Sequence, residues 1–332
     1  MLAGQTRQGV LLVLSGYIVG AGLGIFFKEN AALYVLLVPL FEWTLFDKNE
    51  RKGRLLALII YAPVCLMLLA LLSYFVHPSE AYTTLRDFTL SERLWSQPRA
   101  LGYYLWRYLV PGVSYVGVYA DGFEKSTGML SPISTLLWLT AHASLILAAI
   151  VLRPKLPLLT LGVLFFYVGH SMESGAIPLE LFFEHRNYLP SAMLLLGVLH
   201  LPERKTVSMV MAAVVAVCAF LQYLQAGFWG HAESLHAIAV AENPRSERAV
   251  IAYAAYLDRQ ERYADSLLLM RNYMDRHGFG TDVALNAVKM ACVLRSDTEQ
   301  DIERMLESQG KYRGKASFIT TMMKTLAAWV RE

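Results

Sequence analysis

The chain has 332 residues, of which 55% are apolar and 17% charged, and its formal net charge is +3 at pH 7. The apolar residues form long blocks in the first two-thirds of the chain, a distribution that excludes an ordinary water-soluble globular protein. Three cysteines, two of them inside apolar blocks, do not make a disulfide framework. No Cys-x-x-Cys or His-x-x-x-His pair indicates a metal site, and we expect no nucleic-acid partner. We predict an all-α membrane protein with a soluble tail.

Seven apolar blocks have close to the roughly 20 residues that cross the hydrocarbon core of a bilayer. They cover residues 9–27, 30–46, 55–76, 133–152, 156–172, 188–201 and 206–229. The second and sixth are short and could be tilted or partly re-entrant. Residues 1–230 would form the membrane domain, with an outer amphipathic loop at 77–132 and a helical domain at 231–332.

Lysine and arginine in the short loops set the orientation of these spans. With the N-terminus inside, the inner loops carry Arg7, Lys48, Arg51, Lys52, Arg54, Arg153, Lys155, Arg204 and Lys205. The short outer turns hold only Lys28 and Arg186. We therefore expect a cytoplasmic N-terminus in a bacterial inner membrane, with the long loop and the tail in the periplasm.

The first block carries Gly16, Gly20 and Gly24 at intervals of four, a spacing that lets helix backbones approach closely in lipid. Packing against another helix of this chain is the simpler interpretation, and docking of a missing half or a second copy is the alternative. Lys28 and Glu29 follow in a tight outer turn. Lys28 could snorkel to the interface, and both are candidates to contact a substrate.

In the outer loop, residues 98–109 have a helical pattern that brings Arg99 and Arg107 to nearly one face, among tryptophan and tyrosine residues. This pattern is typical of an interfacial amphipathic helix that contacts membrane lipids, and Arg99 is also a candidate to bind substrate. Asp121 could be a ligand or an Asx-turn residue, of which the turn is the better interpretation.

The densest group of charged residues lies at 170–191, between two apolar blocks, and consists of Glu173, Glu180, Glu184, His185 and Arg186. Charges at the edge of a bilayer are costly unless they face water, a partner or a ligand. This stretch is therefore our first candidate for a functional site.

The residue types of this cluster suit phosphate. Arg186 offers a planar, permanently charged fork for phosphate oxygens, and His185 could donate to the same group or move a proton. Glu184 and Glu173 could orient these cations or bind a divalent metal. The alternative is an internal ion-pair network that only fixes how two helices leave the membrane.

The tail, residues 231–332, is charged, alanine-rich and helical in pattern. Asn243-Pro244-Arg245-Ser246 is typical of a helix start, and later helices are predicted at 282–294, 298–308 and 316–330. The pattern resembles degenerate tetratricopeptide hairpins, whose period is about 34 residues. Such a tail could hold a protein on a concave surface, or only pack against the membrane domain.

Several segments together resemble one class of enzyme. They are Lys28-Glu29-Asn30, Phe41-Glu42-Trp43, residues 86–94 and 119–123 of the outer loop, and above all Glu184-His185-Arg186-Asn187-Tyr188. In these the chain is similar to the C-terminal half of membrane glycosyltransferases of the GT-C class with C-terminal tetratricopeptide repeats, such as the transmembrane O-mannosyltransferases. The resemblance implies a polyprenyl-phosphate sugar as donor. It also places the catalytic carboxylate in a first outer loop that has no counterpart here.

Three interpretations stay open. The chain could be the C-terminal half of a protein glycosyltransferase and need a partner that supplies the carboxylate. It could be a non-catalytic, membrane-anchored accessory whose tail binds a pilin or other periplasmic protein. In the third interpretation Glu29, Asp121 or Glu173 has taken over the role of the base.

Overall fold

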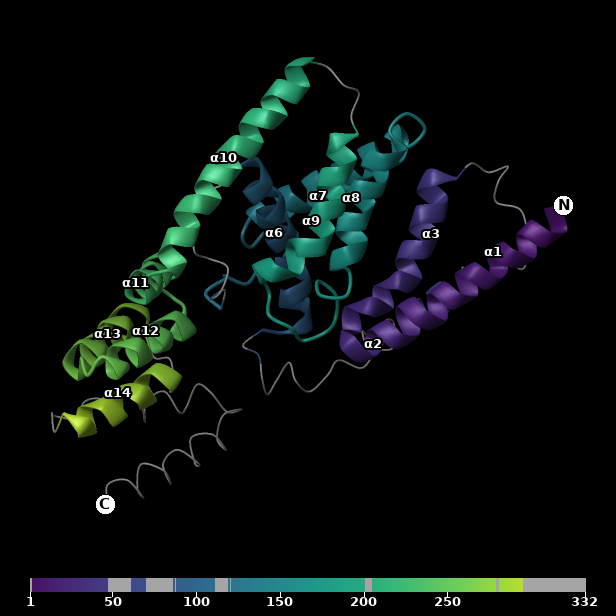
Figure 1. The fold of residues 1–332 in the computed structure, drawn as a ribbon. Coiled ribbons are helices and arrows are strands. Elements are labelled where there is room, and N and C mark those ends of the chain that lie inside the picture. The colour runs from purple at the N-terminus through teal and green to yellow at the C-terminus, as the bar shows by residue number, and fades with distance from the viewer. Residues whose placement is uncertain are drawn as a thin grey trace.

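The computed structural model describes residues 2–46, 61–69, 86, 88–110, 119, 121–200, 205–278 and 281–294. Within these ranges the protein is helical and has no β-strand, which confirms the predicted all-α class. Figure 1 shows three parts: N-terminal helices on one side, a central group formed by α6 to α9, and the long α10 that leads to the tail. The helices predicted at 298–308 and 316–330 lie outside the described residues.

The N-terminal part is a helical hairpin. Helix α1 (Leu2–Gly16), the π-helical η1 (Tyr17–Leu23) and α2 (Gly24–Phe27) follow one another without a break. The 3-10 turn η2 (Glu29–Leu33) then reverses the chain into α3 (Tyr34–Leu45).

The glycine stripe of this hairpin faces the chain's own residues. A Cβ atom on Gly16 would lie 2.9 Å from the hydroxyl of Tyr34, and one on Gly20 would lie 3.4 Å from its ring. A Cβ on Gly24 would lie 2.7 Å from that of Ala31. The close approach that these glycines allow is therefore used within the hairpin.

The central part begins with α6 (Leu90–Leu109). This helix starts eight residues before the predicted boundary at 98, because Thr89 and Glu92 form a capping box: the Glu92 amide donates to Thr89 Oγ1 over 3.2 Å and the Thr89 amide to Glu92 Oε2 over 2.8 Å. Pro98 lies inside the helix. One face of α6 is buried, with Ala100 and Tyr104 packed against Phe166 and Phe182, so α6 packs into the protein instead of lying free at a lipid interface.

Three more helices complete the centre: α7 (Ser134–Leu152), α8 (Pro157–His170) and α9 (Tyr188–Leu199), with the 3-10 turn η3 (Glu184–Asn187) before α9. Helices α8 and α9 cross at two facing glycines. The position of a Cβ on Gly162 is 3.4 Å from Gly197 Cα, and that of a Cβ on Gly197 is 3.4 Å from Gly162 Cα. Small residues at a crossing let two backbones touch.

The tail is an array of short helices after α10 (Lys205–Trp229): α11 (Ala232–Glu242), α12 (Glu247–Arg259), α13 (Tyr263–His277) and α14 (Thr281–Val293). Helix α12 starts where the sequence predicts, since the side chain of Ser246 caps it by accepting from the amide of Ala249 over 3.0 Å. Buried side chains of α12, α13 and α14 share one apolar core.

The buried positions of α12 recur in α14 at an interval of 34 residues. The buried residues of α12 are Ala249, Val250, Ala254 and Leu257, and the residues 34 positions later, Val283, Ala284, Val288 and Ala291, are buried too. Helices α12 and α14 thus present equivalent faces to the core.

Two helical stretches of the described residues are long and apolar enough to cross a membrane, Ser134–Leu152 in α7 and Ser208–Trp229 in α10. They correspond to the predicted spans 133–152 and 206–229. The helices found in the predicted spans 30–46, 156–172 and 188–201 are shorter than those spans, with 12, 14 and 12 residues. At 1.5 Å per residue, 14 residues extend about 21 Å, less than a hydrocarbon core of about 30 Å.

Replacing Gly162 by alanine should destabilise the protein, because the added methyl group would lie 2.6 Å from the carbonyl oxygen of Met193. Overpacking of this kind costs roughly 1–3 kcal/mol. We expect the apparent melting temperature in detergent to fall by about 2–10 °C. Gly227→Ala is the matched control, since a methyl group there meets no atom within 4 Å. Equal melting temperatures for the two variants would contradict the α8–α9 contact.

Candidate functional site

A buried arginine organises residues 171–183 between α8 and η3, which we call the outer segment after the side of the membrane predicted for it. The side chain of Arg93 in α6 is fully buried, with 0% of its surface exposed. Its Nε donates to the carbonyl of Gly175 over 2.8 Å, and its Nη2 donates to the carbonyl of Glu173. Its Nη1 donates to the carbonyl of Leu179 and, over 3.4 Å, to the carbonyl of Glu180. One side chain therefore satisfies four carbonyl oxygens of residues 173–180, a stretch without regular helix.

Other side chains of α6 continue this contact along the same segment. Gln97 donates to the carbonyl of Leu181 over 3.2 Å. The hydroxyl of Tyr104 donates to the carbonyl of Phe183 and accepts from its amide, each over 2.9 Å. Burial raises the pKa of Tyr104 to about 12, so the hydroxyl keeps its proton at physiological pH. Helix α6 thus fixes the path of the chain up to η3.

Arg186, the leading candidate for a phosphate contact, is held by internal partners. Its Nε lies 3.5 Å from Glu173 Oε2, and its Nη1 donates to the carbonyl of Glu180 over 2.7 Å. The other carboxylate oxygen of Glu173 accepts from the side-chain Nδ2 of Asn30 over 2.6 Å. The side chains of Arg186 and Glu173 are only 12% and 10% exposed. These contacts are those of an internal network that joins η2 to the outer segment.

The remaining members of the cluster lie nearer the surface. Glu184 accepts from Arg107 Nη2 over 3.3 Å. His185 is exposed, with its ring 4.4 Å from that of Phe183. Partial desolvation and then the charge of Arg186 lower the pKa of His185, and the charge of Lys28 acts in the same direction. Lys28 and His185 are thus the exposed rim of the cluster, and the side chain of Arg186 is only 12% exposed.

The three candidates for a catalytic base are placed differently. Glu173 is buried in the network with Arg186. Asp121 lies in a turn, but its carboxylate bonds to the tail: Oδ1 accepts from Ser246 Oγ over 2.6 Å and Oδ2 from the amide of Arg248 over 3.3 Å. Glu29 is exposed beside Lys28.

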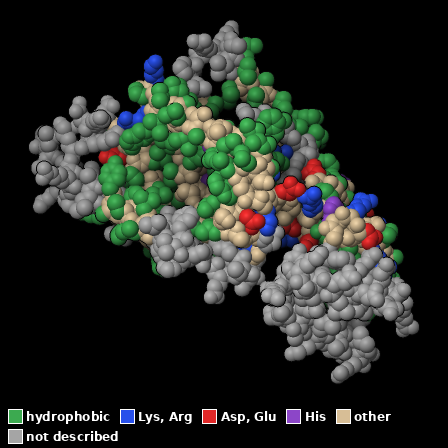
Figure 2. Space-filling view, turned by 180° about the vertical axis from the view of Figure 1, so that it is seen from behind, with side chains coloured by type: hydrophobic (Ala, Val, Ile, Leu, Met, Phe, Trp, Pro, Cys, Tyr) green, Lys and Arg blue, Asp and Glu red, His purple; other side chains and the backbone are tan. Residues whose placement is uncertain are grey.

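Two further ion pairs bind the start of α12 to Glu124 and to the outer segment. Arg245 pairs with Glu124, and Arg248 pairs with Glu180. Hydrogen bonding to Glu180 raises the pKa of the Arg248 guanidinium. Figure 2 shows charged side chains gathered where the tail joins an otherwise largely apolar surface. The tail is thus tied to two outer segments, 121–124 and 180.

Arg99 supports the first of these segments. Its Nη1 donates to the carbonyl of Glu124 over 2.9 Å and lies 3.3 Å from Ser126 Oγ, and its guanidinium lies 5.4 Å from the ring centre of Phe123. It therefore positions the loop that carries the acidic partners of α12.

Sequence reasoning did not single out Arg93 and Arg248 as site residues, nor the buried His170, whose ring packs 5.1 Å from that of Tyr104. The capping pair Thr89 and Glu92 was a local signal that α6 extends back past Arg93. The side-chain bonds of Arg93 and Arg248 reach residues 68 to 87 positions away in the chain, and sequence spacing carries no signal for them.

Within the part of the chain that the structure describes, no three His, Cys, Asp or Glu side chains come together as a metal site. Comparison with protein-family models, curated proteins and solved structures finds no match to this chain.

Arg93→Met should destabilise the outer segment, because it leaves buried carbonyls without donors. We expect a loss of roughly 3–5 kcal/mol, seen as a lower apparent melting temperature and faster proteolysis within residues 171–187. Arg99→Met is the control, since Arg99 is only half-buried and bonds to two acceptors. If both variants behave alike, Arg93 does not have the central role assigned to it.

Proposed function

We propose that this protein is a membrane-anchored scaffold. A multi-span domain holds the helical tail against its outer face, and the tail binds a periplasmic protein such as a pilin. The observation that carries the proposal is the tie at the start of α12: Asp121, Glu124 and Glu180, from two separate outer segments, all bind residues 245–248.

The geometry of this tie favours a fixed tail over a loosely tethered one. Three acidic side chains on two segments restrain the tail from rotating as well as from separating. Ser246 links these contacts to the cap of α12, because its hydroxyl contacts both Asp121 and the amide of Ala249. Holding a binding surface in place reduces the entropy lost when a partner binds.

The recurrence of buried positions 34 residues apart supports a tetratricopeptide-like array. Ser266 in α13 lies at the crossing with α12, where its hydroxyl donates to the carbonyl of Ala254 over 3.3 Å. Stacked helix pairs of this kind present extended surfaces for protein partners. In α13 the side chain of Leu268 is 59% exposed, which makes it suitable for probing that surface.

The membrane part of the proposal comprises seven spans, a cytoplasmic N-terminus and a bacterial inner membrane. The apolar and exposed surfaces of α7 and α10 support it, as does the excess of lysine and arginine in the proposed inner loops. This orientation puts the cluster at 170–191 and the tail on the same side.

A second candidate is the C-terminal half of a glycosyltransferase that uses a polyprenyl-phosphate sugar, with a partner supplying the catalytic carboxylate. The exposed side chains of Lys28 and His185 at the rim favour it. A lysine and an imidazole suit a phosphate at the membrane surface.

The membrane topology can be tested at Cys218, which is exposed on α10. In a Cys65→Ser, Cys292→Ser background, a water-soluble maleimide should leave Cys218 unlabelled in intact membranes and label it in detergent. An Ala232→Cys variant, with Cys218 also replaced by serine, places the thiol past the end of α10 and should be labelled from the periplasmic side. Rapid labelling of Cys218 in intact membranes would show that α10 does not span.

The scaffold can be tested with a photo-crosslinking residue at Leu268. We expect it to capture one periplasmic protein, while the same residue at Leu147, an exposed leucine of α7, does not. The double variant Asp121→Asn, Glu180→Gln should lower the yield about five-fold, because losing roughly 1 kcal/mol of polar contact frees the tail. Unchanged yield from a properly folded double variant would contradict a role for the tie.

The second candidate predicts a different result. Lys28→Ala and His185→Ala alter exposed side chains and should leave the fold intact, yet each should lower sugar transfer about ten-fold when the chain is co-expressed with a partner that bears the carboxylate. The scaffold predicts that both variants keep the Leu268 cross-link at full yield. Loss of transfer together with an unchanged cross-link would mean that both candidates apply.

A further inference from the structure

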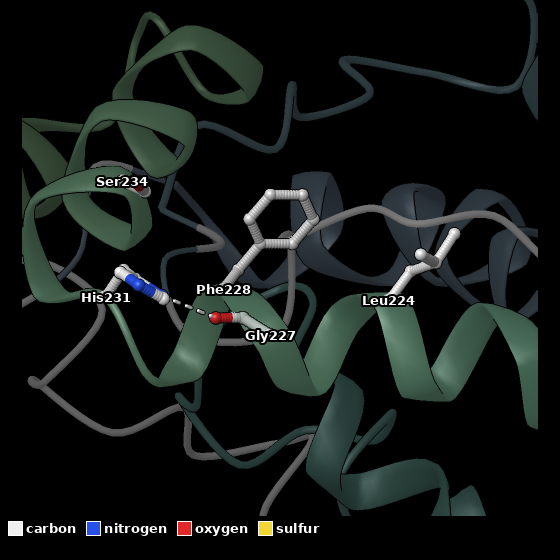
Figure 3. A pocket seen from close by; sticks show the side chains of 5 residues that line it. All are labelled: Leu224, Gly227, Phe228, His231 and Ser234. Atoms are coloured by element: carbon white, nitrogen blue, oxygen red, sulfur yellow. Dashed lines mark hydrogen bonds between the residues drawn. The ribbon is translucent and has the colours of Figure 1, made fainter.

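A hollow opens where α10 meets α11 (Figure 3). It is lined by Leu224, Gly227, Phe228, His231 and Ser234 and has a volume of about 620 Å³, within the range of small-molecule sites. Leu224, Gly227 and Phe228 belong to the last turns of α10, and His231 is the residue before α11. Gly227 leaves the hollow open between them, since a Cβ there would meet no atom within 4 Å.

The hollow is apolar at one end and polar at the other. Leu224 and Phe228 project to one side of α10, while His231 and Ser234 lie at the start of α11 (Figure 3). Together they match an amphiphile, whose chain lies along the apolar end and whose headgroup meets the polar one.

The hydrogen bonding of His231 indicates which headgroup would fit. Its Nδ1 lies 3.1 Å from the carbonyl oxygen of Gly227, and a carbonyl can only accept. Nδ1 therefore carries the hydrogen, and Nε2 of the neutral ring is an acceptor. The hydroxyl of Ser234 can accept as well. The polar end thus offers acceptors to a group that donates hydrogen bonds.

The position of the hollow on α10 points to a lipid as the occupant. The stretch Ser208–Trp229 has the length and hydropathy of a span, and its side chains are not buried by the rest of the protein. If α10 spans as proposed above, the hollow lies at the outer membrane boundary, where Leu224 and Phe228 face acyl chains and His231 faces headgroups. This step rests on the proposed topology.

We infer that the hollow binds one phospholipid with a primary ammonium headgroup. Such a group has three N–H donors for His231 Nε2 and Ser234 Oγ, whereas a quaternary ammonium has none. The inference therefore separates two lipids of the same charge and similar size, phosphatidylethanolamine and phosphatidylcholine.

The test uses the full chain in nanodiscs of phosphatidylglycerol mixed with equal amounts of phosphatidylethanolamine and phosphatidylcholine. After extraction into mild detergent, native mass spectrometry counts the retained lipids. We expect one phosphatidylethanolamine, retained about five-fold over phosphatidylcholine, the ratio expected for one net hydrogen bond.

Three variants make the test specific. Gly227→Leu fills the hollow and should abolish retention of both lipids, whereas Ala213→Leu, an exposed position of the same helix, should not. His231→Ala keeps the hollow and should remove only the preference, which covers the case in which Gly227→Leu misfolds.

Equal retention of the two lipids by the unaltered protein, or a preference that survives His231→Ala, would overturn the inference. The labelling of Cys218 distinguishes the absence of a lipid site from the case in which α10 does not span the membrane. If Cys218 is protected and no lipid is retained, the lipid site alone is contradicted. If Cys218 is freely labelled, the proposed topology is contradicted as well.

Discussion

The path of the chain between α8 and η3 depends on the burial of one guanidinium group. A permanently charged side chain without exposed surface is tolerated only where its donors are satisfied, and Arg93 meets that condition with four carbonyl oxygens of residues 173–180. The dependence is mutual, because that stretch is irregular and its carbonyls lack helical donors. Arg93 therefore replaces the hydrogen bonds that secondary structure would have supplied, and it fixes where Glu173 and Glu180 lie.

Glu180 connects this part of the protein to the tail. Its carbonyl accepts from Arg93 and Arg186, and its carboxylate pairs with Arg248 and lies 3.9 Å from Arg86. A single residue thus belongs to the internal network of the centre and to the tie of α12. This arrangement explains why most of a cluster that suits phosphate chemistry in its residue types is engaged within the protein, with Lys28 and His185 left at the exposed rim.

Local signals predicted much of the helical framework and the place of the candidate site. The helix start near Ser246 and the apolar helices α7 and α10 lie where the patterns put them, and the charged cluster stands out because ionisable residues between apolar blocks are rare. The pattern at 98–109 predicts a helix that begins at Pro98, whereas the capping pair Thr89 and Glu92 starts α6 at Leu90. The predicted lipid-facing helix is half-buried because its polar side chains bond to segments far away in sequence.

The sequence by itself determined the all-helical class, the two long apolar helices and the concentration of charge at 170–191. These features depend on the types and spacing of residues that are close together in the chain. Only the tertiary structure decided the partners: Arg93 with the carbonyls of 173–180, Arg186 with Glu173, and Arg248 with Glu180. Each of these arginines has the same donors, so the choice of acceptor depends on which segments the packing of α6, α8 and α12 brings together.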